Sequence, residues 1–339
     1  MRIITCASYY GTGSSAVTDF FSEFSQIHSL GDYEYRFLQD PDGIADLEYN
    51  IVENNHRHNT SDAIKRFLRF MHANKVQGYG GYDIFGNSLE ELTNRYVEEL
   101  TELKALAWWN KDRVDRGRLF GMIDRFYSLY KRFITGNLHS ERKFSLLQKS
   151  EYGYFTAISE EQFLRATRRY VHDLLASACP EEPDFLMVDQ MVPPTNTKRY
   201  LRYFDDAKII VVDRDPRDIY LLEKLVWQWG VIPVRTAEEF VKWFKITRKY
   251  VNASEEDHDK VLRIHFEDMI YDYDNTAQRL MDFIGIDPKD HVRPFTAFNP
   301  DISIRNTRLY KRVKGHDDEI RLIESELKDF IVPESFYDK

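Results

Sequence analysis

The sequence predicts an α/β fold in which a mainly parallel central sheet is flanked by helices. Two observations lead to this prediction. Short runs of β-forming residues alternate with segments of helical periodicity at both ends of the chain, as in sheets whose parallel strands are joined by helices. In addition, the apolar run at 208–213 shows no polar alternation, which is typical of a strand covered on both faces.

The elements follow in order from the N-terminus. Residues 2–7 predict a first strand, residues 14–24 a first helix and residues 27–30 a second, short strand. A middle region, at about 60–150, is mostly helical in its pattern. It is interrupted at 78–82 by a Gly-Tyr-Gly-Gly-Tyr segment, which predicts a mobile loop.

Strands and helices alternate again in the second half of the chain. Because ligands bind at the carboxyl ends of the strands in such sheets, the turns that follow these strands are the expected place for a site. The predicted strands lie at 184–189, 208–213 and 261–266, and the predicted helices at 160–176, 196–204, 216–229, 275–284 and 317–330.

Composition narrows the class of protein. Of the 339 residues, 42% are hydrophobic and 30% are charged, as in globular proteins. The formal net charge of −9 disfavours a general nucleic-acid binder, and two cysteines exclude a disulfide scaffold or a four-cysteine zinc site. No apolar run reaches the ~18 residues of a membrane helix, and the N-terminus lacks a signal-peptide core. We therefore expect a cytoplasmic protein without a membrane span.

The turn between the first strand and the first helix is the first candidate site. Glycines allow a sharp turn and a close approach of backbone N–H groups to a ligand. The N-terminus of the following helix attracts anions. The turn therefore predicts a phosphate-binding loop, and its residues are Gly11, Thr12, Gly13, Ser14, Ser15 and Ala16.

The kind of phosphate ligand stays open at this point. The turn lacks a Gly-Lys-Ser/Thr triplet, which disfavours a nucleoside triphosphate. Gly11, Gly13 and Ala16 match the pattern G-x-G-x-x-A, and Asp32 follows at about the 20-residue distance of a dinucleotide fingerprint. An NAD(P)-dependent oxidoreductase is therefore one alternative.

A second candidate site is the segment Arg-Asp-Pro-Arg-Asp at 214–218, which follows the strand at 208–213. Arg214 and Arg217 are placed to hold an anion through planar, bidentate donors. The alternative is that the neighbouring aspartates only pair with these arginines.

The third motif is Phe-Glu-Asp-Met at 266–269, followed by Phe-Ile-Gly at 283–285. Taken in this order, the three motifs resemble the PAPS-dependent sulfotransferase family, where PAPS is 3′-phosphoadenosine 5′-phosphosulfate. The resemblance covers residues 1–30 and about 184–290.

The resemblance implies a P-loop-like three-layer fold, in which residues 1–339 form one domain with a largely helical, acceptor-side insertion at about 60–180. It also implies transfer of sulfonate from PAPS to a hydroxyl, with PAP (adenosine 3′,5′-bisphosphate) as product and no metal. The turn at 11–16 would hold the 5′-phosphosulfate, and Arg214 and Arg217 the 3′-phosphate.

The sequence departs from the family pattern at two positions. The family's basic residue before the loop corresponds to Gly11, so another cation is expected there, from among Arg36, His56, His58 and Lys65. A serine that often helps bind the 3′-phosphate corresponds to Leu222. The basic C-terminal stretch is expected to replace it, through Arg308, Lys311, Arg312 and Lys314. The alternative for that stretch is a solvated run of charges.

Glu34 is the candidate base for the acceptor hydroxyl. It follows the second strand and stands two residues before Arg36, and several Golgi members of the family place a catalytic glutamate beside an arginine at this point. The alternative for Glu34 is a surface salt bridge to Arg36. His56 and His58 are the second candidates for the base.

The acceptor is expected to be a carbohydrate. Trp108 and Trp109 offer flat surfaces for sugar rings, and arginines that follow them suit acidic groups, at Arg113, Arg116 and Arg118. The alternative is core packing for the tryptophans together with a solvated helix face for the arginines. The expected enzyme is bacterial and acts on a surface polysaccharide or glycolipid precursor. A catalytically silent module that binds a nucleotide or a glycan is the third alternative.

Overall fold

The computed structural model describes residues 1–76, 79–136, 143–251 and 256–338. The chain divides into two compact units, which are described separately below. The first unit consists of Met1–Asp40, Asn74–Leu89 and Arg168–Lys339, and the second of Pro41–Ala73 and Glu90–Thr167.

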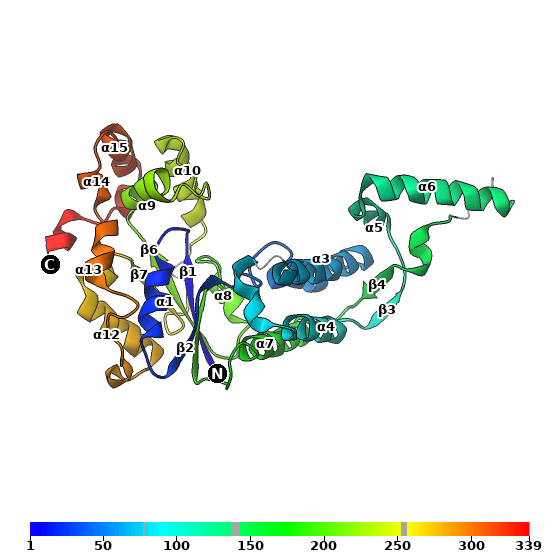
Figure 1. Cartoon of the computed structure of the whole chain (residues 1–339), viewed down its shortest axis with the longest axis horizontal. Helices are drawn as coiled ribbons and strands as arrows, with labels where there is room; N and C mark the ends of the chain where they lie inside the picture. Colours follow the sequence, from blue (N-terminus) through cyan, green and yellow to red (C-terminus); the bar gives the residue numbers. More distant parts are fainter. Residues whose placement is uncertain (77–78, 137–142, 252–255, 339) are drawn as a thin grey trace. The chain divides into compact units, whose positions relative to one another are not determined.

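A five-stranded sheet forms the centre of the first unit (Figure 1). Its strands are β1 (Arg2–Ser8), β2 (Ile27–Glu34), β5 (Phe185–Asp189), β6 (Ala207–Asp213) and β7 (Val261–His265). They lie in the order β2-β5-β1-β6-β7, and every neighbouring pair is parallel. All five carboxyl ends therefore meet at one edge, with the end of β1 in the middle of it.

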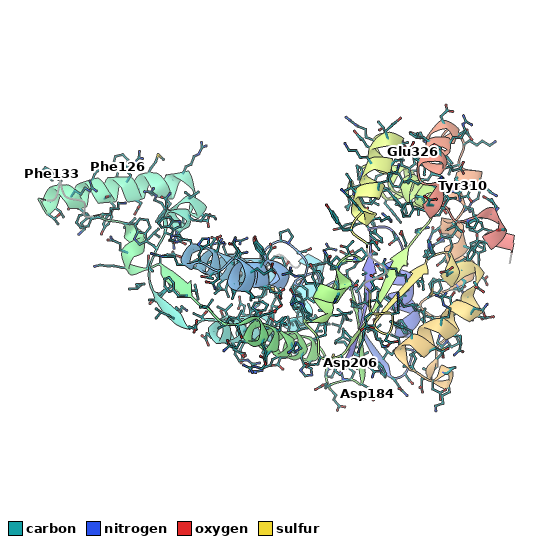
Figure 2. The ribbon with its side chains drawn as sticks, turned by 180° about the vertical axis from the view of Figure 1, so that it is seen from behind. Phe126, Phe133, Asp184, Asp206, Tyr310 and Glu326 are labelled. Atoms are coloured by element: carbon teal, nitrogen blue, oxygen red, sulfur yellow. The ribbon has the colours of Figure 1, made fainter. Side chains whose placement is uncertain are left out.

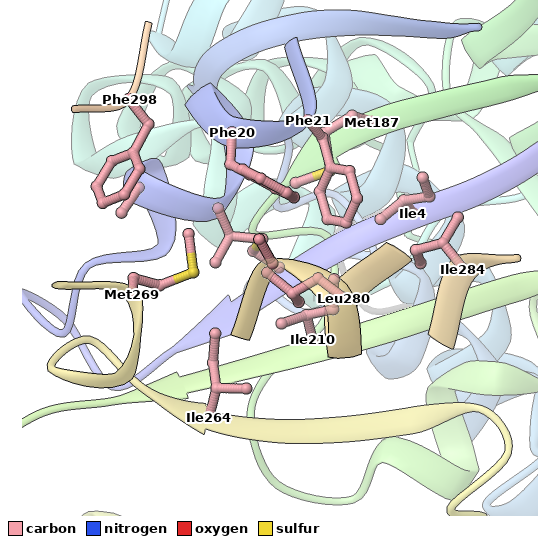
Figure 3. Packing of buried hydrophobic residues seen from close by; sticks show 14 of the residues in the cluster. Ile4, Phe20, Phe21, Met187, Ile210, Ile264, Met269, Leu280, Ile284 and Phe298 are labelled. Atoms are coloured by element: carbon pink, nitrogen blue, oxygen red, sulfur yellow. The ribbon is translucent and has the colours of Figure 1, made fainter. Parts of the chain in front are cut away.

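Helices cover the sheet on both sides, which confirms the predicted α/β class. Figure 1 shows α1 (Ser14–Ser22) and α12 (Tyr273–Ile284) on one side and α8 (Thr197–Leu201) on the other. The first side is sealed by a buried cluster in which Phe20 of α1 and Leu280 of α12 lie over the sheet residues (Figure 3). Such an apolar face supplies most of the free energy that holds a helix to a sheet.

A second apolar cluster joins the helices that follow β6. It unites α9 (Pro216–Leu222), α10 (Ala237–Arg248) and α15 (Asp317–Glu326) around the buried side chains of Phe240 and Ile323. The C-terminal helix is thereby fixed to the segment that carries the second predicted motif.

The second unit is mostly helical, as the pattern of the middle region predicts. It contains α2 (Ile44–Glu48), most of α3 (Arg57–Val76) and α4 (Ser88–Leu100), and the whole of α5 (Asn110–Asp115) and α6 (Gly117–Ile134). It also contains an antiparallel strand pair that the sequence did not predict, β3 (Leu103–Leu106) with β4 (Tyr152–Phe155). These strands have four residues each, too few to show a clear alternation. Helix α7 (Glu160–Ala176) runs from the second unit into the first.

The structure corrects part of the prediction that residues 78–82 form a mobile loop. Residues Tyr79–Phe85 form a 3₁₀ helix, η2, while Gly78 lies outside the described residues. A Cβ atom on Gly81 would stand 2.5 Å from the ring of Tyr33 on β2, so this segment is packed closely against the sheet.

Several element ends also differ from the predictions. Strand β2 extends to Glu34, α8 ends at Leu201, and α9 ends at Leu222. The chain continues from α9 into a π-helical turn, η4 (Glu223–Trp227), because the N–H of Gln228 bonds the carbonyl of Glu223 at 2.9 Å. Among the described residues, none of the helices has both the length and the apolar character needed to cross a membrane.

The buried cluster over the sheet predicts a large effect of Leu280→Ala. Leu280 is fully buried between α12 and the sheet, so the substitution leaves a cavity and is expected to lower the free energy of unfolding by ~2–5 kcal/mol. Urea unfolding measures this change. Leu225→Ala, at a leucine that is 40% exposed, is the matched control and should cost less than about 1 kcal/mol. Equal losses in the two variants would contradict this packing.

Candidate active site

The loop between β1 and α1 is shaped by three residues in the left-handed region. Tyr10, Gly11 and Gly13 have φ angles of 68°, 64° and 96°. A Cβ atom on Gly11 would lie 2.5 Å from the ring of Trp227, and one on Gly13 2.5 Å from the ring of Phe266. Both glycines are therefore required by backbone conformation and by contact, as expected of a loop that turns sharply onto a helix.

Thr12 holds the loop to the sheet. Its side chain is fully buried. Its Oγ1 donates to the carbonyl oxygen of Val212 at 2.7 Å and accepts from the N–H of Tyr9 at 3.3 Å. The hydroxyl of Thr12 therefore positions the loop, and a predicted contact of Thr12 with a phosphate would have to use its backbone N–H.

Ser14 and Ser15 differ in their surroundings. The Ser14 hydroxyl donates to Asp189 at 3.3 Å and accepts from the side-chain amide of Gln190 at 3.1 Å. Ser15 is exposed, whereas Ala16 is buried against the core. Of the two hydroxyls, that of Ser15 is open to a ligand.

No side chain caps the N-terminus of α1 within the described part of the chain. Gly13 is the N-cap residue and offers no side-chain acceptor, and the first turn holds no acidic residue. The first N–H groups of a helix have no partner inside the helix. Those of Ser14 and Ser15 are thus available for an anion, and the helix dipole favours one there.

Arg214 brings the second motif to this loop. Its Nη1 lies 3.4 Å from the carbonyl oxygen of Gly11, and its Nη2 donates to the carbonyl oxygen of Asn306. Its guanidinium carbon stands 4.2 Å from the centre of the Phe266 ring, and its Nε has no partner among the described residues. Burial lowers the pKa of Arg214, although nearby carboxylates oppose this shift. Two segments about two hundred residues apart therefore form one site.

Glu267 of the third motif is fully buried and bonds the residue that follows Arg214. One carboxylate oxygen accepts from the N–H of Asp215 at 3.1 Å, and the other has no hydrogen-bond partner within the described part of the chain. Complete burial raises the pKa of Glu267 to about 8, and the positive charge of Arg214 reduces this shift.

Arg217 is committed to structural contacts. It pairs with both carboxylate oxygens of Asp215, at 2.9 and 2.6 Å, and with Glu324 at 2.8 Å. It also donates to the carbonyl oxygen of Val332 at 3.2 Å and stacks on Tyr310 at 3.7 Å. Burial acts to lower the pKa of Arg217, but its hydrogen bonds to Asp215 raise the pKa above its ordinary value. The prediction that Arg217 clamps an anion is corrected in favour of the aspartate-paired alternative.

The C-terminal basic stretch is joined to the second motif, and two of its four predicted basic residues are paired with an acid. The carboxylate of Asp218 accepts from the N–H groups of Arg308 and Leu309, both at 2.7 Å, and burial raises the pKa of Asp218 to about 6. The side chains of Arg308 and Lys311 pair with Glu334.

The two remaining basic residues of this stretch differ. Arg312 donates to the carbonyl oxygen of Arg305 at 2.7 Å, whereas Lys314 is exposed and has no hydrogen bond or ion pair among residues 1–76, 79–136, 143–251 and 256–338. Lys314 is therefore the basic residue of the stretch that stays open to an anion. Leu222, at the position of the family's serine, is buried.

Glu34 and Arg36 stand beside the loop, as predicted. Glu34 lies opposite Asp189 in the register of β2 with β5. The Nη2 of Arg36 donates to the hydroxyl of Tyr10 at 3.0 Å, and its Nη1 lies 3.6 Å from the Glu34 carboxylate. Arg36 also pairs with Asp40 at 2.8 Å. Partial burial raises the pKa of Glu34, and Arg36 opposes that shift.

The sequence analysis did not assign a role to two residues of this edge, Trp227, which covers Gly11, and Asp189, which bonds Ser14. Tyr10, which directly precedes the predicted loop, contacts Arg36. Burial raises the pKa of Asp189 well above its ordinary value, and the charge of Glu34 adds to the effect. Asp189 ends a predicted strand, so the rule that sites follow strand ends could have found it. No local signal marks Trp227.

The two candidate histidines belong to the second unit, and their predicted roles stay predictions. The ring of His58 stacks on Trp109, with 3.8 Å between the ring centres and 18° between the planes. Both rings, with Trp108, line one hollow of that unit. His56 is exposed.

Lys65 is not an open cation. It pairs with Asp112 at 2.6 Å and with Glu151 at 2.7 Å. Glu151 also binds Arg116 at 2.7 Å, while Arg113 donates to Asn110 and Arg118 is exposed.

The family model that describes the sulfotransferase family matches residues 111–290, more than half of the chain. The chain belongs to the sulfotransferase family. This match confirms the predicted resemblance and the predicted class of enzyme. No protein of curated function matches the sequence.

Three solved structures resemble this sulfotransferase weakly. The sulfotransferase domain of the Synechococcus PCC 7002 olefin synthase is 12% identical, covers 98% of this chain and 95% of its own, and has a TM-score of 0.42. Retinol dehydratase, in complex with androsterone and the inactive cofactor PAP, is 15% identical over 97% and 81%, with a TM-score of 0.35. A Mycobacterium avium sulfotransferase is 11% identical over 97% and 76%, with a TM-score of 0.37. At these values the similarity supports no conclusion by itself.

The order of the strands argues against the dinucleotide alternative. In the Rossmann fold the second strand lies beside the first. Here β5 lies between β1 and β2, so the strand that carries Asp32 is not the neighbour of the strand that carries the loop. The match of Gly11, Gly13 and Ala16 to that fingerprint is therefore local.

The burial of Glu267 predicts a specific pH dependence of stability. The folded protein keeps a proton that the unfolded chain loses above a pKa of 4.5, so the free energy of unfolding falls as the pH rises from 4.5 to about 8. Glu267→Gln is always neutral and should remove up to roughly 1.4 kcal/mol of this fall per pH unit. Urea unfolding across this pH range measures the difference. The exposed Glu238→Gln is the control, and parallel pH profiles of wild type and Glu267→Gln would contradict the prediction.

Proposed function

We propose that this protein transfers the sulfonate group of PAPS to a hydroxyl of a carbohydrate acceptor. One observation carries the proposal. The contact of Arg214 with Gly11, at 3.4 Å, joins the loop expected to hold the 5′-phosphosulfate to the strand end expected to hold the 3′-phosphate. Membership of the sulfotransferase family supports the reaction class.

The donor would be held by groups at the β1–α1 turn and the end of β6. The N–H groups of Ser14 and Ser15 and the Ser15 hydroxyl face an anion at the helix N-terminus. Arg214 offers its unpaired Nε, and Lys314 of the C-terminal stretch would supply a further cation. When bound, PAPS supplies an activated sulfonate and a bisphosphate leaving group.

The catalytic groups would come from the end of β2. Glu34 takes the proton of the acceptor hydroxyl while the new bond from oxygen to sulfur forms and the bond from sulfur to the bisphosphate oxygen breaks. Arg36, held at the loop through Tyr10, supplies the positive charge that Gly11 lacks. Charge that spreads over sulfonate and bridging oxygens is stabilised by donors already in place.

The second unit would form the acceptor side of a single domain. Trp109 is 51% exposed and stacks with His58 in a hollow of that unit. Flat aromatic surfaces with polar neighbours suit the faces of sugar rings. A surface-polysaccharide or glycolipid precursor in a bacterial cytoplasm is the acceptor that we propose.

The donor site predicts selective stabilisation by adenosine 3′,5′-bisphosphate. At about 100 times its dissociation constant the bisphosphate adds about 2.7 kcal/mol, so the melting temperature should rise by roughly 2–5 °C. ATP and NAD should leave it unchanged. Arg214→Gln should abolish the shift, whereas Arg235→Gln, at an arginine whose side chain is 85% exposed, should keep it. A shift with NAD alone would overturn the proposal in favour of the oxidoreductase.

The assignment of the base predicts the effect of Glu34→Gln. Loss of general-base catalysis should lower kcat by about 10²–10⁴-fold, while the bisphosphate shift stays the same. Transfer from radiolabelled PAPS to a panel of glycan, glycolipid and phenol acceptors measures the rate. Asp32→Asn, an exposed acid on the same strand, is the matched control and should stay within about twofold. A loss below about tenfold would reject Glu34. Bisphosphate binding without transfer in the wild type would identify a silent module.

A further inference from the structure

Helix α6 (Gly117–Ile134) presents a continuous apolar face to solvent. Six of the side chains on this face recur at helical spacing, and each is more than half exposed: Leu119, Met122, Phe126, Leu129, Tyr130 and Phe133. Phe126 and Phe133, labelled in Figure 2, are 71% and 73% exposed. Helices of globular proteins normally turn such a stripe toward the core.

The helix is attached to its unit through its polar side. Asp124 is buried and accepts from the hydroxyl of Ser145 at 2.9 Å and from the N–H of Leu146 at 2.7 Å. Gly121 and Ser128 lie on the same side by helical spacing. The orientation of α6 is therefore fixed by hydrogen bonds that leave the apolar face outward.

The charges of α6 are positive on its solvent side. Arg118, Arg125 and Arg132 follow one another at intervals of seven residues, so they line one flank of the apolar face. Lys131 follows Asp124 by seven residues, so it lies on the inward side of the helix and not beside the apolar face. Asp124 is the acid of this helix, and it is turned inward. The chain as a whole has a net charge of −9, so α6 is a local basic surface on an acidic protein.

We propose that α6 binds an anionic membrane surface, with its axis in the plane of the interface. A wide apolar face rich in Phe and Leu, flanked by arginines, is the chemistry by which amphipathic helices insert into the headgroup region. Anionic lipid complements the flanking charges. An antiparallel second copy of α6, packed face to face, would place the two rows of arginines on the same side, where they repel each other. The inference is independent of the proposed reaction.

Vesicle flotation of the full chain tests this proposal. The protein should float with vesicles of phosphatidylcholine mixed with phosphatidylglycerol, and much less with phosphatidylcholine alone. The double variant Phe126→Ser, Phe133→Ser should partition at least tenfold less, because two exposed rings no longer enter the lipid. Ile246→Ser with Tyr250→Ser, at residues that are 55% and 70% exposed elsewhere, is the matched control and should float as the wild type does.

A charge variant tests the second half of the proposal. Arg118→Glu with Arg125→Glu should lower binding to the anionic vesicles by at least tenfold, as should high salt. Arg235→Glu is the control for charge reversal. Because all substituted side chains are exposed, circular dichroism and the bisphosphate shift should be unchanged in every variant, which separates this test from that of the proposed reaction.

Three results would overturn the proposal. One is a wild-type chain that does not float with the anionic vesicles. Another is a Phe126→Ser, Phe133→Ser variant that floats as the wild type does. The third is a wild-type dimer, measured by sedimentation equilibrium without lipid, that this variant converts to monomer. The face would then belong to an interface with a second copy.

Discussion

Two buried aspartates hold the C-terminal segment against the end of β6, and the shape of the candidate donor site depends on them. Asp215 pairs with Arg217 and accepts from the N–H of Val332. Asp218 accepts from two successive N–H groups at Arg308 and Leu309. Charges as buried as these are tolerated only when hydrogen bonds satisfy them. The aspartates that flank the arginines of this motif thus position a distant stretch of chain.

The two arginines of the motif consequently have different tasks. Arg217 donates hydrogen bonds to two carboxylates and to a carbonyl oxygen, so it stabilises the fold. Arg214 donates to the carbonyl oxygens of Gly11 and Asn306, and these oxygens carry no full charge. Within the described part of the chain its charge is therefore not neutralised by a direct ion pair, and burial keeps the nearby Glu267 protonated near neutral pH. A buried cation in this condition favours an anionic ligand.

The sequence was sufficient for the elements that its local patterns specify. The strands of the central sheet, the glycine turn and the pairing of Glu34 with Arg36 follow from apolar runs, from the positions of the glycines and from neighbouring charges. The sequence was insufficient where the partner of a side chain is remote. Arg217 pairs with Glu324, about one hundred residues away, and Lys311 pairs with Glu334, about twenty residues away. The outward apolar face of α6 was missed for a related reason, since periodicity locates a helical stripe but not the side that the unit covers.

The departure at Gly11 is explained by its surroundings. A side chain at this position would require a residue other than glycine at a φ of +64° and would collide with the ring of Trp227 at 2.5 Å. A lysine or arginine there would therefore need a change at Trp227 as well. In the proposed mechanism the cation instead comes from another element: Arg36 reaches the loop through Tyr10, and its pairing with Asp40 fixes its direction. The glycine at position 11 and the ring of Trp227 thus fit each other, and Arg36 is the residue that brings a positive charge to the loop in their place.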